Sequence, residues 1–253
     1  MPLILVDPTH DRHRHRPAPT GTRAPTRHPP TPRRTMTTTA DAPTQETAPD
    51  GERAVRADFW FDPMCPWAWM TSRWMTEVAE HRPVDLHWHV MSLSVLNEGR
   101  DLPDGYRQLM DQAWRPVRVI TAARLAHGED VVKPLYDAIG TRLHPGGRKD
   151  DLRAVLAESL AEVGLPAELL DAADDDAHDE ELRASHQRAI DLVGDEVGTP
   201  VVAVEGVAYF GPVVTPAPRG EDALRLWDGL VLMTQVPGFY ELKRTRTQGP
   251  VLD

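Results

Sequence analysis

Apolar and polar residues follow a strand–helix–strand pattern in the first well-patterned part of the chain. Residues 57–62 are short, aromatic-rich and closed by a proline, and residues 84–91 alternate apolar and polar side chains, so each segment predicts a β-strand. Between them, apolar side chains recur at helical spacing behind Pro66, a residue that suits a first helical turn. We therefore expect a helix over residues 66–80 and a parallel pair of strands joined by a crossover.

The rest of the pattern predicts a block of helices followed by a hairpin and a closing helix. Residues 104–193 lack strand signals and contain several helical stretches. Two runs of β-branched and aromatic residues, 201–204 and 207–210, flank a Glu-Gly turn and predict a hairpin. An amphipathic helix is expected over residues 221–235. The predicted class is α/β, in the order β-α-β, helices, β-β-α.

The N-terminal part has a different composition. Residues 1–50 hold ten of the 24 prolines and no Phe, Trp or Tyr. Such a segment buries too little apolar surface to offset the entropy of ordering it. We expect residues 1–55 to be a disordered extension and residues 56–253 to form the folded domain. The apolar stretch at the very start is too short for a secretory signal.

Charge and cysteine content exclude several classes of function. A formal net charge of -11 disfavours a general nucleic-acid binder, and no apolar run approaches the roughly 18 residues of a membrane span. The single cysteine, Cys65, excludes an internal disulfide. A lone thiol stays reduced in the cytoplasm, which is the expected location. His87 and His89 have no partner ligand at a convincing spacing, so no metal is expected.

Cys65 is the candidate nucleophile. It falls where the first strand meets the first helix, and Pro66 fixes the helix start directly behind its sulfur. The free amides and dipole of a helix N-terminus stabilise an anion, so we expect the pKa of this thiol to lie below that of a free cysteine. The alternative is a small buried apolar residue at a strand end.

A second motif, Gly198-Thr199-Pro200, leads into a predicted strand. Together with Cys65-Pro66-Trp67 and the element order, it resembles DsbA-like thioredoxin-fold proteins, most closely the actinobacterial mycothiol-dependent nitroreductases. The similar stretches extend over residues 57–253. Examples are Phe61-Asp62-Pro63, Leu96-Asn97-Glu98, Trp114-Arg115-Pro116, Phe210-Gly211-Pro212 and Glu241-Leu242-Lys243-Arg244-Thr245-Arg246.

The resemblance implies a thioredoxin fold with a helical lid inserted at about residues 100–193, and mycothiol as the thiol cofactor. It also implies a cis peptide bond between Thr199 and Pro200, facing Cys65. The substrate or thiol would then be bound by residues around that cysteine. These are Pro66, Trp67, Asn97, Tyr106, Thr199 and Pro200.

The chain departs from the family's Cys-Pro-Trp-Cys motif at one position, where it has Ala68. An intramolecular disulfide cannot form, so the expected chemistry uses one thiol: Cys65 attacks a disulfide and a second thiol molecule resolves the mixed disulfide. The expected partners are a small thiol or disulfide and a small electrophile, and a homodimer is compatible with the sequence. Two alternatives are a transferase or isomerase of the kappa-class glutathione transferase type, and a non-catalytic binding module.

Overall fold

A computed structural model of the protein describes residues 53–252. Most of the expected extension, residues 1–52, lies outside the described part. The described elements, in chain order, are β1 (Val55–Phe61), α1 (Pro66–Ala79), β2 (Val84–Val90), α2 (Leu93–Leu96), α3 (Asp104–His127), α4 (Val132–Leu143), α5 (Leu152–Glu162), α6 (Asp179–Val193), β3 (Val201–Val204), β4 (Val207–Phe210) and α7 (Gly220–Thr234). Short 3-10 helices, η1 (Glu129–Val131), η2 (Lys149–Asp151) and η3 (Ala167–Asp174), lie between helices.

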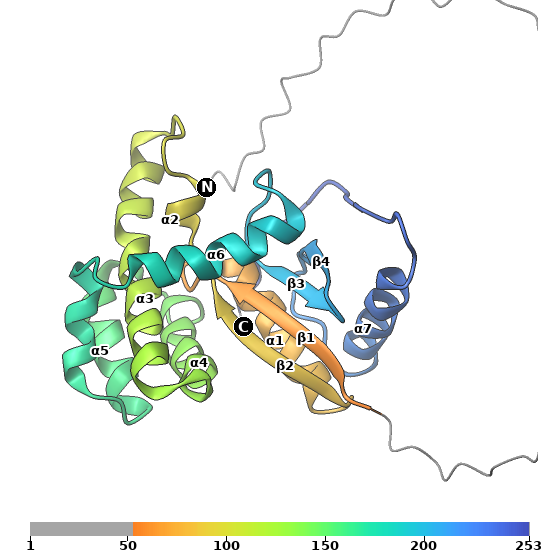
Figure 1. The fold of residues 1–253 in the computed structure, drawn as a ribbon, viewed down its shortest axis with the longest axis horizontal. Helices are drawn as coiled ribbons and strands as arrows, with labels where there is room; N and C mark the ends of the chain where they lie inside the picture. The colour runs from red at the N-terminus through yellow and green to blue at the C-terminus, as the bar shows by residue number, and fades with distance from the viewer. Residues whose placement is uncertain (1–52, 253) are drawn as a thin grey trace, which may run out of the picture. The chain divides into compact units, whose positions relative to one another are not determined.

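The four strands form one mixed sheet in the order β2-β1-β3-β4 (Figure 1). β1 and β2 are parallel, and Phe59 lies opposite Trp88. β3 runs antiparallel to both β1 and β4. The hairpin turn holds Glu205 and Gly206 at positive φ, 48° and 85°, a backbone conformation that glycine adopts readily. The predicted strands, the parallel pair and the α/β class are confirmed, and the fold is that of thioredoxin.

Helices cover both faces of the sheet. α6 crosses in front of the strands in Figure 1, and α1 lies behind them. The face under α6 has its own apolar cluster, in which Trp60, Val201 and Ala203 of the sheet pack with Ala189 of α6. On the other side, α1 packs against α7, and the Trp74 indole N–H donates to the Ala223 carbonyl over 2.9 Å. Alternation along β1 thus directs successive side chains into two different cores.

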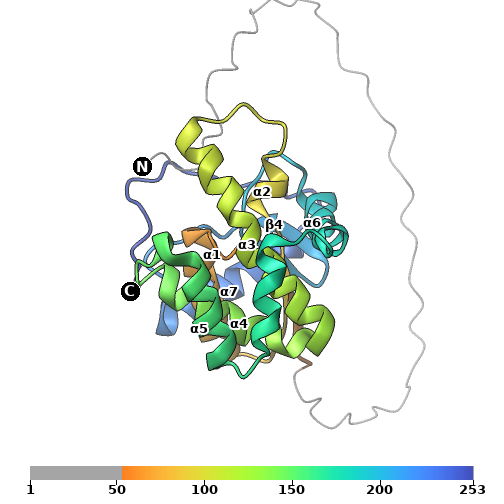
Figure 2. The same cartoon turned by 90° about the vertical axis from the view of Figure 1, so that its left-hand side faces the viewer.

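Helices α3, α4 and α5 lie together beside the sheet, as Figures 1 and 2 both show. Their contact with the sheet is aromatic. The centroid of the Tyr136 ring on α4 lies 3.9 Å from that of Phe61 and 6.1 Å from that of Trp88. Because Tyr136 and Phe61 are fully buried, the inserted helices and the sheet share one apolar core here. Within residues 53–252, no helix is long and apolar enough to cross a bilayer.

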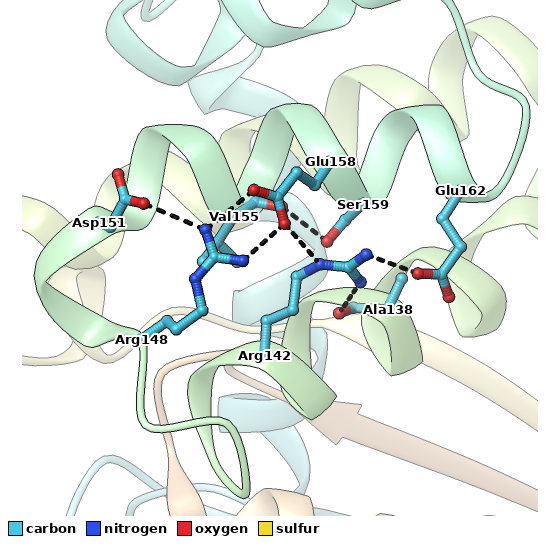
Figure 3. A network of polar contacts seen from close by, with 8 residues as sticks. All are labelled: Ala138, Arg142, Arg148, Asp151, Val155, Glu158, Ser159 and Glu162. Atoms are coloured by element: carbon cyan, nitrogen blue, oxygen red, sulfur yellow. Dashed lines mark hydrogen bonds and ion pairs between the residues drawn. The ribbon is translucent and has the colours of Figure 1, made fainter.

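An ion network joins α4 to α5 on the outer side of the insertion (Figure 3). Glu158 accepts from Arg148 over 2.6 Å and from Arg142 over 3.2 Å. Arg142 also reaches Glu162 over 2.6 Å, and Arg148 reaches Asp151 over 3.1 Å. Hydrogen bonds from the two arginines lower the pKa of Glu158 to about 2. Because the network is solvent-exposed, we expect it to contribute little to the free energy of unfolding. Its main effect is to orient the two helices.

Gly140 of α4 packs directly against the Trp69 ring of α1. A Cβ at this position would lie 2.3 Å from the ring of Trp69, which is 3% exposed and stacked on His144. We expect Gly140→Ala to lower the free energy of unfolding by about 1–3 kcal/mol, the usual effect of overpacking. Denaturant titration would measure this.

Gly229→Ala is the matched control, because Gly229 is also helical and a Cβ there meets no atom within 4 Å. This variant should be neutral or more stable by about 0.5–1 kcal/mol, since alanine is the better helix former. Equal effects of the two substitutions would contradict the close packing at Gly140.

Candidate active site

Cys65 is the N-cap residue of α1. Its backbone is extended, and its sulfur accepts a hydrogen bond from the Ala68 N–H over 3.5 Å. Pro66 occupies the first helical position, as the sequence predicts. The side chain of Cys65 is 1% exposed, and it is the one cysteine of the chain. The sulfur therefore lies against free amides at the helix start, in a site closed to solvent.

The Thr199-Pro200 loop faces this thiol. The peptide bond between the two residues is cis, and the Thr199 carbonyl lies 3.4 Å from the Cys65 sulfur. The thiol donates to this carbonyl. The Thr199 hydroxyl accepts from the Asp62 N–H over 3.3 Å, which ties the loop to the end of β1. The structure thus brings together two sequence-predicted site residues that are 134 positions apart.

Asp62 braces the loop that carries the nucleophile. One carboxylate oxygen accepts from the Met64 N–H over 2.8 Å, and the other accepts from the Leu93 N–H over 2.7 Å. The carboxyl group is fully buried, and this burial raises its pKa to about 7 against the opposing effect of the two N–H donors. Asp62 links the end of β1, the Cys65 loop and the start of α2 through one side chain.

The inserted helices contact the same loop. His144, directly after α4, bonds through its Nε2–H to the Pro63 carbonyl over 2.9 Å. Burial lowers the pKa of His144 to about 4, so the ring is neutral at pH 7. Its Nδ1 has no partner among the described residues. The position of the nucleophile loop is therefore coupled to that of the insertion.

The remaining predicted site residues lie on three elements: Trp67 on α1, Asn97 at the end of α2 and Tyr106 at the start of α3. Tyr106, at the start of α3, is close enough to Cys65 and Asp62 that both oppose its ionisation, and its pKa is raised by burial and by these two groups. Asn97 lies beside Tyr106 and donates to the Leu93 carbonyl over 2.8 Å. Trp67 follows Pro66 on α1 and is 3% exposed, with the guanidinium of Arg246 5.2 Å from its ring centroid.

The expected low pKa of Cys65 is wrong for this closed state. Burial raises the pKa to about 12 and outweighs the amides of Ala68 and Trp67, which lower it. The negative charge of Asp62 also raises the pKa, while Lys149 lowers it. The helix N-terminus acts as expected, but a thiol removed from water keeps its proton. Cys65 is a neutral thiol here.

Four further residues of the site are not among the site residues predicted from the sequence: Asp62, His144, Lys149 and Arg246. Asp62 had a local signal, because an Asp whose side chain bonds the N–H two residues later is a common turn before a helix. The other three lie far from Cys65 in sequence and carry no local signal. No cluster of three or more His, Cys, Asp or Glu residues in the described range could hold a metal ion.

A thioredoxin fold with one thiol at a helix start and a cis-proline loop facing it defines a protein of the thiol oxidoreductase class. The profile of the Rv2466c-like family, described as mycothiol-dependent nitroreductase Rv2466c, matches residues 64–244. The chain belongs to this family, and it is an enzyme of the oxidoreductase class. It is 34% identical over 196 residues to the uncharacterized protein Rv2286c of Mycobacterium tuberculosis, covering 77% of this chain and 84% of that protein.

Solved structures share the fold. A 2-hydroxychromene-2-carboxylate isomerase matches with a TM-score of 0.51 and 14% identity over 71% of this chain and 95% of its own. The cytosolic disulfide reductase DsbM of Pseudomonas aeruginosa, solved with GSH, matches with a TM-score of 0.47 and 20% identity over 70% of this chain and 99% of its own. At these identities the likeness concerns the fold alone.

Proposed function

We propose that the protein is a mycothiol-dependent thiol oxidoreductase that acts through one nucleophile, Cys65, and a mixed-disulfide intermediate. The carrying observation is the sulfur's position, 3.5 Å from the Ala68 N–H and 3.4 Å from the Thr199 carbonyl, in a chain with no second cysteine. The family indicates that the thiol cofactor is mycothiol. Because a second cysteine is missing, Cys65 is the only protein thiol that can take part in each turnover. Such a reaction requires reduced thiols, and we place it in the cytoplasm.

Each half of the reaction is an exchange at sulfur. The thiolate of Cys65 attacks one sulfur of a disulfide, the sulfur–sulfur bond breaks, and the other half leaves as a thiolate that takes up a proton. Cys65 is then held as a mixed disulfide until a second thiolate attacks it and releases the Cys65 thiolate. Cys65 ends the cycle as the thiolate it began as, so the protein undergoes no net change of oxidation state. The attacking thiol is the reductant, and it leaves as part of the product disulfide.

The residues around the sulfur fit these steps. When the site opens and water reaches Cys65, the desolvation that raises its pKa falls, and the N–H groups of Ala68 and Trp67 stabilise the thiolate. The Thr199 carbonyl can then accept from an amide of the bound thiol's chain in place of the Cys65 proton. Asn97 and Tyr106 supply further polar groups on the side of the insertion, for the hydroxyl-rich part of mycothiol.

A second candidate is a transferase or isomerase that activates the thiol cofactor instead of attacking with its own sulfur. The raised pKa of Cys65 favours this reading, because a protonated Cys65 can donate a hydrogen bond to a bound thiolate. In that case Cys65 stays free through turnover.

The intact mass of the protein after mixing with mycothiol disulfide distinguishes the exchange mechanism from the transferase or isomerase. We expect a single mycothiol adduct, removed by excess mycothiol and absent in Cys65→Ser, the isosteric control without a nucleophilic sulfur. A wild-type protein that stays unmodified while it converts an electrophile in a mycothiol-dependent way would reject the exchange mechanism in favour of the transferase.

A further inference from the structure

Two cationic side chains border the Cys65 site without a carboxylate partner in the described part of the chain. Arg246 holds its guanidinium 5.2 Å from the ring centroid of Trp67, two residues beyond the nucleophile. Lys149, in η2, lies close enough to Cys65 to stabilise its thiolate by charge. Neither forms an ion pair with any described residue, although the protein is acidic, with a formal net charge of -11.

Nearby basic residues contrast with these two. Arg148, the immediate neighbour of Lys149, is bound to Glu158 and Asp151. Arg73, one turn and a half beyond Trp67 on α1, is bound to Asp137. Glu158, Asp151 and Asp137 are thus engaged by other arginines, and Asp62 is bound by the Met64 and Leu93 N–H groups. No carboxylate of the described residues pairs with Lys149 or Arg246.

The position of Arg246 is fixed by the fold. The segment that follows α7 is bound to Thr215, in the loop after β4. The Thr215 hydroxyl donates to the Gly249 carbonyl over 3.4 Å and accepts from the Val251 N–H over 2.8 Å, while Gln248 donates to the Thr215 carbonyl over 3.3 Å. These bonds hold the chain just beyond Arg246, so that its guanidinium lies over Trp67. Stacking uses the face of the guanidinium and leaves its in-plane N–H donors free.

We propose that Arg246, assisted by Lys149, binds an anionic group on the disulfide or electrophile that Cys65 attacks, and so selects a carboxylate-bearing small molecule as the second substrate. The proposal rests on the proposed function. Mycothiol is an amide-linked sugar thiol with no charge apart from its thiolate, so it does not need these cations. The in-plane donors of an arginine match the two oxygens of a carboxylate, which is the anion that we propose.

The test compares two chromogenic disulfides in single-turnover reactions with excess reagent. One is 5,5′-dithiobis(2-nitrobenzoate), which carries a carboxylate on each ring; the other is 2,2′-dithiodipyridine, which is neutral. In both, the Cys65 thiolate displaces a coloured thiolate and retains the other half as a mixed disulfide. Because Cys65 is the only cysteine, all protein-dependent release reports on this residue.

We expect Arg246→Gln to slow the reaction with the dianionic reagent about fivefold relative to the neutral one, with a smaller loss for Lys149→Gln. Arg246→Lys should retain most of the preference. Arg244→Gln is the matched control: it removes the same charge from the same segment, and Arg244 forms no ion pair or ring contact with the described site residues. It should leave the ratio of the two rates unchanged. Added salt should lower the wild-type ratio.

Equal slowing of both reagents by Arg246→Gln would overturn the proposal, because it would show a general effect on the thiol. Faster reaction with both would also overturn it, by showing that the segment only shields the site. If wild-type protein reacts with neither reagent, even after long incubation, the exchange function itself fails. If wild-type protein reacts at a normal rate with the neutral reagent, and Arg246→Gln leaves the ratio of the two rates unchanged, only the role of Arg246 is rejected.

Discussion

Ala68→Cys is expected to convert the one-thiol protein into a dithiol that oxidises to an internal disulfide. Position 68 adjoins the nucleophile, since its N–H lies 3.5 Å from the Cys65 sulfur. A disulfide needs Cα atoms about 4.4–6.8 Å apart, a separation that the first turn of a helix provides. Under mild oxidant the variant should lose two hydrogens, and its mycothiol adduct should no longer persist, because the new thiol attacks it at high effective concentration.

Mass spectrometry with and without an alkylating agent measures both effects. In wild-type protein, turnover should rise with mycothiol concentration and the adduct should accumulate when mycothiol is scarce. In Ala68→Cys, release of the first product should become independent of mycothiol.

Ala79→Cys is the matched control, since Ala79 ends the same helix at an exposed position. Its thiol would lie about 20 Å from Cys65, given a rise of about 1.5 Å per residue, and could not form the bond. If Ala68→Cys stays a free dithiol under oxidant, the geometry assigned to the site is wrong and the transferase reading gains support.

Asp62→Ala is expected to destabilise the protein by about 2–5 kcal/mol, because it leaves the N–H groups of Met64 and Leu93 buried without an acceptor. Asp62→Asn keeps one acceptor oxygen and should be affected less. Denaturant titration at fixed pH would rank the three proteins. Equal stability of Asp62→Ala and wild type would contradict the bracing role of the carboxylate.

The same carboxyl group predicts a pH dependence of stability. Its pKa is raised from 3.8 to about 7 in the folded state, so the folded protein binds this proton more tightly than the unfolded chain does. The resulting stabilisation is complete below pH 3.8 and is lost as the pH rises through about 7. Its upper bound is about 4 kcal/mol.

Asp62→Asn should remove this slope between pH 4 and 8, whereas Asp111→Asn, at an exposed position on α3, should retain it. The comparison uses melting temperature against pH. A wild-type protein that becomes more stable across this range through Asp62 would overturn the assigned direction.

Local patterns predicted the fold well because its strands and main helices are encoded within single segments. Alternation in residues 84–91 and the apolar spacing behind Pro66 each depend on neighbours in sequence, and β2 and α1 lie where expected. Within the block of helices, the apolar spacing predicts helical stretches at residues 106–126, 152–162 and 181–193, but none over α4. It is short, has Pro134 in its first turn and lies between 3-10 segments, so it carries only a weak periodic signal.

The candidate site could be predicted only in part. The N-cap position of Cys65 and the Thr199-Pro200 loop followed from motifs and from the family resemblance. The sign of the thiol's pKa shift did not, because it depends on how completely the sulfur is buried by distant parts of the chain. The same holds for His144, whose bond to Pro63 joins residues 81 positions apart.

The contact between Gly140 and Trp69 has an evolutionary consequence. A β-carbon at position 140 would lie only 2.3 Å from the Trp69 ring, so the residue allowed at position 140 depends on the residue at position 69. A smaller residue at 69 would free position 140 to carry a side chain, and any side chain at 140 would require that reduction first. Relatives that retain the tryptophan at position 69 should therefore retain the glycine at position 140. Relatives with a side chain at position 140 should have a smaller residue at position 69.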